Sequence, residues 1–223
     1  WLSSGTNFAN AWHSLNPLWT ACRAITSMPV AWQFFFQLMA QHSLGQTPAA
    51  LHQLNVWLDD EQFQHYALRH TLLLAAGIIY GTIGDLKRLE QIGRSVLKLG
   101  LDEEKPLSIT WARHFLGFVN YQWNRLDEAY AHWSAAPEWR YQANFRAYHE
   151  AVLGLALLYQ TRGDEAPAQH TLDMLTQDLL EMNQGQFVPE VEAFRARLAL
   201  LRGDMITAVH WTQSGAQPAR LPL

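Results

Sequence analysis

Histidine, cysteine and acidic side chains could do chemistry in this chain, but their spacing matches no known catalytic or metal-binding pattern. His65 and His70 lie five residues apart, so a helix does not present them on one face. The sequence contains no His-Glu-x-x-His motif and no Cys/His cluster with the spacing of a zinc site. The only cysteine, Cys22, is interpreted as a small buried residue in a reducing compartment.

His149 and Glu150 form the one pair that invites a catalytic interpretation. Neighbouring residues on a helix point about 100° apart, so these two side chains are not expected to act on the same atom. No nucleophile, base and orienting group occur together elsewhere in the sequence. We therefore predict a protein that is not an enzyme, with no metal site and no cofactor.

Five turns recur along the chain and set the positions of all other residues. Their turn residues are spaced by 39, 40, 39 and 40 residues, and each is a glycine or asparagine, which tolerates a positive φ. These residues are Gly45, Gly84, Asn124, Gly163 and Gly203. Small or apolar residues recur seven positions before and five positions after the turns, as in Gly117 and Ala129. A fixed period near 40 residues predicts stacked helical hairpins.

The expected fold is all-α, a right-handed superhelical array of about five antiparallel helical hairpins that is similar to tetratricopeptide repeats. No strand-like alternation of useful length occurs. The expected helices are 29–44, 47–58, 62–83, 85–99, 106–123, 126–135, 141–162, 164–182, 188–202 and 204–214. In this interpretation Gly100 ends the second hairpin.

Three segments are expected along the chain. Residues 1–27 form an irregular helical cap, residues 28–216 form the repeat domain, and residues 217–223 form a truncated linker. Because the chain starts at Trp1 and stops in a proline-rich stretch, we expect a fragment of a longer protein.

The first helix of each hairpin is expected to line the inner face of the array, through positions 13, 10, 6 and 3 before the turn. These positions are Trp111, His114, Phe118 and Tyr121 in the third hairpin, Glu150, Leu153, Leu157 and Gln160 in the fourth, and Glu190, Ala193, Arg197 and Leu200 in the fifth. From them we select six ligand-binding candidates: Trp111, His114, Phe118, Tyr121, Glu150 and Arg197. Rings would stack on a ligand and the two charges would orient it.

The same aromatic stripe has a second interpretation, as interhelical core. Aromatic residues at helical spacing are more often buried between helices than exposed to a ligand. Alanine substitution of Trp111 and Tyr121 separates the two interpretations, because a site would lose ligand binding while a core would unfold.

Several stretches carry a resemblance to a known family. Arg113–Ala129, Glu138–Tyr148, Leu153–Asp164 and Phe194–Asp204 resemble the sensor region of large ATP-dependent bacterial transcriptional regulators of the LuxR/MalT type. The resemblance is clearest over residues 67–214. It implies a cytoplasmic domain that senses a small-molecule inducer or a regulatory protein. It also implies an NTPase module before the array and a helix-turn-helix domain after it; neither motif occurs in this sequence.

Composition predicts a folded protein, and the net charge argues against a broad nucleic-acid-binding surface. Of 223 residues, 49% are hydrophobic and 16% are charged, which excludes a disordered chain. The net charge of −4 argues against a broad nucleic-acid-binding surface. The most apolar stretch, 72–83, is too short to cross a membrane. A general tetratricopeptide-type adaptor for proteins, unrelated to transcription, is the alternative function.

Overall fold

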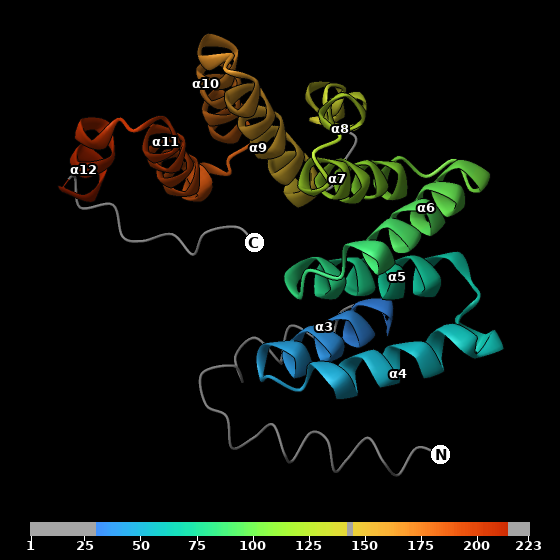
Figure 1. The fold of residues 1–223 in the computed structure, drawn as a ribbon. Coiled ribbons are helices and arrows are strands. Elements are labelled where there is room, and N and C mark those ends of the chain that lie inside the picture. The colour runs from blue at the N-terminus through green and yellow to red at the C-terminus, as the bar shows by residue number, and fades with distance from the viewer. Residues whose placement is uncertain (1–29, 142–144, 214–223) are drawn as a thin grey trace. The chain divides into compact units, whose positions relative to one another are not determined.

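The computed structural model describes residues 30–141 and 145–213, and all of its regular elements are helices (Figure 1). The all-α prediction is therefore confirmed for this part of the chain. The expected cap at 1–27, Cys22 and the expected linker at 217–223 lie outside the described residues. None of the helices in the described ranges has both the length and the hydropathy that a bilayer span requires.

The helices follow the expected order along the chain. They are α3 (Val30–Ser43), α4 (Thr47–Asp59), α5 (Tyr66–Thr82), α6 (Leu86–Asp102), α7 (Pro106–Gln122), α8 (Leu126–Trp133), α9 (Phe145–Arg162), α10 (Glu165–Glu181), α11 (Val188–Arg202) and α12 (Met205–Gln213). Three short 3-10 helices lie between them: η1 (Glu61–Phe63), η2 (Ala136–Trp139) and η3 (Gly185–Phe187).

All five predicted turn residues adopt the left-handed backbone conformation. Their φ angles are 77° at Gly45, 73° at Gly84, 57° at Asn124, 86° at Gly163 and 82° at Gly203. Each one follows an odd-numbered helix and precedes the even-numbered helix of the same hairpin. The chain reverses at these points because the left-handed residue stops one helix and redirects the backbone.

Four predicted helix boundaries are wrong by two residues or more. Helix α8 ends at Trp133 and not at residue 135, and α9 begins at Phe145 and not at residue 141. Helix α6 does not stop at Gly100 but continues to Asp102. A Cβ atom at Gly100 would lie 2.8 Å from Ser108 Cβ and 2.9 Å from the Ile109 backbone nitrogen, so glycine here permits close packing of α6 on α7. Helix α5 begins at Tyr66, four residues later than expected, because η1 occupies the residues before it.

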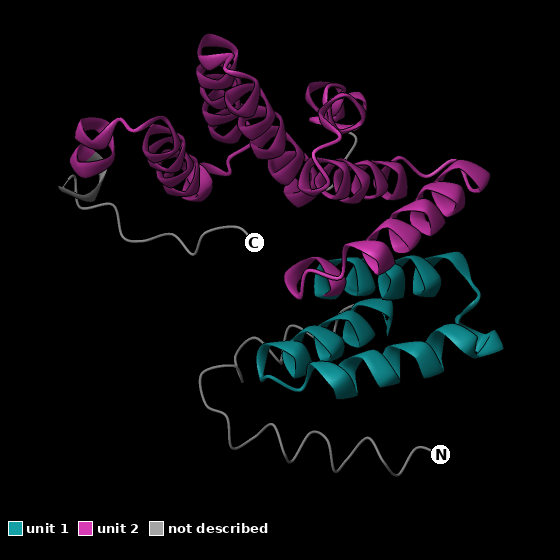
Figure 2. Ribbon diagram, in the orientation of Figure 1, with its two compact units in different colours: residues 1–79 teal, residues 80–223 magenta. Residues whose placement is uncertain are grey.

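The chain divides into two compact units, residues 1–79 and residues 80–223, with the boundary inside α5 (Figure 2). In the first unit α3 packs on α4. Three rings fix this contact: the Phe34 ring lies 4.8 Å from the Trp57 ring and 5.0 Å from the Phe63 ring, between centroids. Edge-to-face aromatic contacts of this kind add to the hydrophobic gain of burial.

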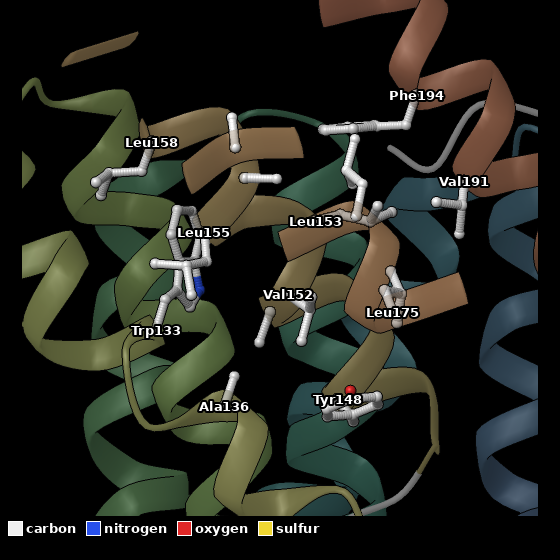
Figure 3. Close-up of a cluster of buried hydrophobic side chains, with 14 of the residues drawn as sticks. Trp133, Ala136, Tyr148, Val152, Leu153, Leu155, Leu158, Leu175, Val191 and Phe194 are labelled. Atoms are coloured by element: carbon white, nitrogen blue, oxygen red, sulfur yellow. The ribbon is translucent and has the colours of Figure 1, made fainter. Parts of the chain in front are cut away.

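The second unit contains the largest described core. Helix α7 packs on α6, α8 and α9, and α9 packs in turn on α10 and α11. Buried apolar side chains from α8, α9, α10 and α11 form one cluster, which includes Trp133, Leu155, Leu175 and Phe194 (Figure 3). Phe118 and Tyr121 of α7 pack against it. The core therefore runs continuously through the third, fourth and fifth hairpins.

Trp133 of α8 fills the space between α7 and α9, and it is only 1% exposed. A Cβ atom added at Gly117 of α7 would lie 2.3 Å from the Trp133 Nε1 atom. One added at Gly154 of α9 would lie 2.7 Å from the same indole, at Cζ2. The small residue at Gly117 thus makes room for a large ring from the second helix of its hairpin.

Candidate functional site

A pocket of about 220 Å³ opens within the second unit, between α7, α8, α9 and α11. It is lined by His114, Phe118, Tyr121, Gln122, Trp133, Glu150, Leu153, Gly154, Leu157, Phe194 and Arg197. Its volume corresponds to roughly seven water molecules at about 30 Å³ each. The space suits a small molecule, not a folded partner.

Five of the six candidate ligand-binding residues line this pocket together. His114, Phe118 and Tyr121 come from α7, Glu150 from α9 and Arg197 from α11. They occupy inward positions of three consecutive hairpins, so the 40-residue register places them side by side. Leu153 and Leu157, two more inward positions of α9, complete the apolar part of the wall.

Trp111 is the exception, because it does not line the pocket. It is 7% exposed, and its ring packs 5.9 Å from His114 and 5.5 Å from Phe115, between centroids. Trp111 thus lies in the core position that the second interpretation of the stripe describes, and it supports the rings beside the pocket.

The pocket carries one acidic and one basic side chain. Glu150 forms an ion pair with Arg146, with 2.5 Å between Glu150 Oε1 and Arg146 Nη2. The exposed Arg197 guanidinium lies 5.6 Å from the centre of the Phe194 ring. No carboxylate of the described residues lies within ion-pair distance of Arg197, so its five donors are available to an anionic or hydrogen-bond-accepting group.

Tyr121 is held in place by a hydrogen bond between its hydroxyl and the Thr161 hydroxyl, at 2.8 Å. Its ring lies 6.0 Å from the Trp133 ring, between centroids. Because α7 and α9 both contribute to this contact, the aromatic wall is fixed before any ligand arrives.

Comparison of the chain with protein-family models, curated proteins and solved structures found no match. The pocket is therefore interpreted from its own residues.

Sequence reasoning missed four lining residues: Gln122, Trp133, Gly154 and Phe194. It considered only the first helix of each hairpin, whereas Trp133 reaches the pocket from the second helix of its hairpin. The signal for Trp133 was present, because a glycine or alanine stands seven residues before four of the five turns and requires a neighbour to fill the space.

Sequence reasoning also set aside His149 and Glu150 as a pair, because the two side chains diverge on one helix. In the structure Glu190 of α11 joins them, and the three side chains have ligand atoms within 4.8 Å of one another. Glu190 and Glu150 both lie 13 residues before a turn, one repeat apart. That equivalence was the available signal for their proximity.

Buried ionisable groups around the pocket have shifted pKa values. Burial lowers the pKa of His114 to about 4, and the positive charge of Arg146 acts in the same direction. Burial lowers the pKa of His149 to about 3, with further contributions from Arg146 and His114. Burial raises the pKa of Glu150 to about 7; the Glu190 charge adds to this increase, and Arg146 opposes it. Both histidines are therefore neutral at pH 7.

These shifts predict that His114 weakens the fold in acid. The unfolded chain binds a proton at His114 below about pH 6.5, whereas the folded protein resists it down to about pH 4, so stability falls as pH falls through this window. Glu150 acts in the opposite direction, because its stabilising protonated form is lost as pH rises through about 7. In the His114→Gln variant, the loss of unfolding free energy between pH 7 and pH 5 should shrink by roughly 1–2 kcal/mol.

Urea denaturation at pH 5 and pH 7, in buffer containing EDTA, measures this difference. His210→Gln, which replaces an exposed histidine of α12, is the control. An equal pH dependence in wild type and His114→Gln would contradict the prediction.

Proposed function

We propose that this chain is a non-catalytic sensor domain that binds a small polar molecule in the pocket between α7, α8, α9 and α11. The domain is a right-handed, tetratricopeptide-like array within a cytoplasmic bacterial transcriptional regulator of the LuxR/MalT type. Occupation of the pocket by an inducer controls activation by the neighbouring modules, and this segment makes no direct contact with nucleic acid or membrane.

The observation that carries the proposal is the convergence of inward positions from three hairpins on one pocket. Phe118 and Tyr121 offer ring faces, Arg197 offers donors without an acidic partner among the described residues, and Glu150 offers acceptors. A ligand with a flat apolar face, an acceptor or anionic group and a donor matches these three features. A ligand that spans three hairpins couples their relative positions, which is what a sensor requires.

Ligand binding is tested by a thermal-shift screen of sugars, oligosaccharides and nucleotides, followed by calorimetric titration of the compound that stabilises the protein. Arg197→Ala should weaken that compound's affinity by roughly 10- to 100-fold, because a hydrogen bond to a charged group contributes about 1.5–3 kcal/mol. Phe118→Ala should weaken it as well, through loss of ring contact.

Arg94→Ala provides the matched control. Arg94 is exposed on α6, outside the pocket, and forms an ion pair with its helix neighbour Glu90. This variant should bind as wild type does. Equal affinity of Arg197→Ala and wild type would place the ligand elsewhere and remove the pocket from the proposal.

The regulatory context is tested on the full gene product that contains this chain. The proposal requires a phosphate-binding loop before the array and a helix-turn-helix domain after it. It also requires that Arg197→Ala abolish inducer-dependent transcription while the protein still accumulates. A gene product with neither module would contradict the regulator assignment and leave only the binding pocket.

A protein-binding adaptor is the second candidate, favoured by the last hairpin. Five apolar side chains of α11 and α12 are 44–86% exposed: Leu200, Leu201, Met205, Ile206 and Val209. Repeat arrays bury such faces against another hairpin or a partner protein. In an adaptor, Ile206→Asp would abolish complex formation with the partner protein and Arg197→Ala would not; a small-molecule sensor gives the opposite result with its inducer.

A further inference from the structure

His149 is a completely buried histidine whose two ring nitrogens have no hydrogen-bond partner in the described part of the chain. A buried polar atom that loses water without gaining a partner makes an unfavourable contribution to the free energy of folding. Most buried polar atoms in folded proteins avoid this cost. The imidazole therefore calls for a partner that protein atoms do not supply.

Two carboxylates face this imidazole. The His149 Nε2 atom lies 3.8 Å from the Glu190 Oε2 atom, and one atom each from His149, Glu150 and Glu190 fall within 4.8 Å of one another. His149 and Glu150 come from α9 and Glu190 comes from α11, which packs on α9. The donor set consists of one nitrogen and two carboxylates.

Arg146 is the cation that now faces the two acids. Its Nη2 atom lies 2.5 Å from Glu150 Oε1, and its Nη1 atom lies 3.6 Å from Glu190 Oε2. The Arg146 side chain is 40% exposed, whereas the carboxylates are 14% and 9% exposed. A single guanidinium thus reaches into a buried site from its open side and balances one of two negative charges.

We propose that His149, Glu150 and Glu190 bind a divalent transition-metal ion, with Zn²⁺ as the preferred probe, in competition with the Arg146 guanidinium. Neutral imidazole nitrogen and carboxylate oxygen are both zinc ligands, at about 2.0–2.2 Å. In a tetrahedral site such ligand atoms lie roughly 3.4 Å apart. The 3.8 Å separation of His149 and Glu190 is close to this value. When Arg146 leaves, the Glu150 side chain moves closer to the other two ligands and reaches the tetrahedral spacing.

The charges around the cluster agree with this assignment. Glu150 and Glu190 share the single Arg146 guanidinium, so two carboxylates face one positive charge. The favourable Coulomb energy of the two carboxylates is larger with a divalent ion than with one shared guanidinium, because the ion carries twice the charge.

Calorimetric titration of the EDTA-treated protein with ZnCl₂ tests the site directly. The wild-type chain should bind one Zn²⁺ ion that His149→Gln and Glu190→Gln each weaken at least 10-fold. Removing the competing cation in Arg146→Gln should strengthen binding several-fold. A purely structural ion pair predicts the opposite for Arg146→Gln: lower stability in EDTA and no gain in zinc affinity.

Histidine is a common zinc ligand, so a control at a histidine outside the cluster is needed. His132→Asn changes a histidine of α8 outside the cluster and should leave the one-ion titration unchanged. The Co²⁺-loaded wild-type protein supplies a readout that needs no variant to fold, because visible d–d absorption reports low-symmetry coordination by nitrogen and oxygen.

The proposal is overturned if neither wild type nor Arg146→Gln gives saturable zinc binding, or if Glu190→Gln binds as tightly as wild type. It does not rest on the proposed sensor function. Glu150 is the one residue shared with the pocket, whereas Arg197→Ala should disturb the inducer and leave zinc affinity unchanged.

Discussion

Replacing Gly117 with alanine is expected to destabilise the protein by about 1–3 kcal/mol, the typical cost of overpacking a core. Alanine usually stabilises a helix by about 1 kcal/mol relative to glycine, so the sign of this effect is diagnostic. Here the new methyl group would meet the Trp133 indole at 2.3–2.7 Å. The indole cannot move away from the new methyl group, because the Gly154 backbone already packs against the ring from α9.

Thermal and urea denaturation of Gly117→Ala measure the effect. Gly81→Ala is the matched control: it adds the same methyl group to a helical glycine, but the nearest atom is Leu89 Cδ2 at an ordinary 3.7 Å. This control should be neutral or slightly stabilising. Trp133→Ala should itself cost about 3–5 kcal/mol, as other large-to-small core substitutions do. If Gly117→Ala stabilised the chain as Gly81→Ala does, the close packing of Trp133 would be refuted.

Replacing Asp178 with alanine is expected to destabilise the protein by about 2 kcal/mol or more, because it leaves a buried hydroxyl without its hydrogen-bond acceptor. The Tyr148 hydroxyl donates a hydrogen bond to Asp178 Oδ2, and Tyr148 is fully buried. Burial, together with the Asp178 carboxylate, raises the pKa of Tyr148, so the phenol remains a donor. Arg140 adds a second contact to Asp178, at 2.6 Å between Nη1 and Oδ1.

Asp178→Asn should lose less stability than Asp178→Ala, since the amide oxygen still accepts the Tyr148 hydrogen bond. Asp173→Ala on the same helix is the control: Asp173 is 68% exposed and pairs with Arg195 at the surface, so its loss should stay within about 0.5 kcal/mol. A double-mutant cycle with Tyr148→Phe isolates the pair. Additive effects in this cycle would show that the two side chains do not interact.

The turns were predictable because their requirement is local. A residue that must adopt a positive φ is glycine or asparagine in most proteins, so Gly45 and Asn124 mark their turns in the sequence itself. Helix ends that depend on packing were harder to predict. Gly100 resembles a stop signal in the sequence, yet it serves the contact between α6 and α7.

The part of the candidate site that follows from the 40-residue repeat register was predictable. Counting back from each turn identified Phe118, Glu150 and Arg197 as inward residues, and the structure places all three at one pocket. The register does not say how deep a side chain lies, so Trp111 was chosen as a site residue although it is buried. It also treats each helix alone, and for this reason the approach of Glu190 to His149 was not foreseen.

The Trp133 indole between two glycines restricts how this sequence can change over evolutionary time. The three positions belong to three different helices, α7, α8 and α9, and each permits only what the other two leave room for. A larger residue at Gly117 or Gly154 fits only after Trp133 has been replaced by a smaller residue. That smaller residue in turn leaves a cavity until one of the glycines is replaced by a larger residue. Single substitutions at these positions are therefore costly in either order, and lineages that depart from the trio should do so through paired replacements.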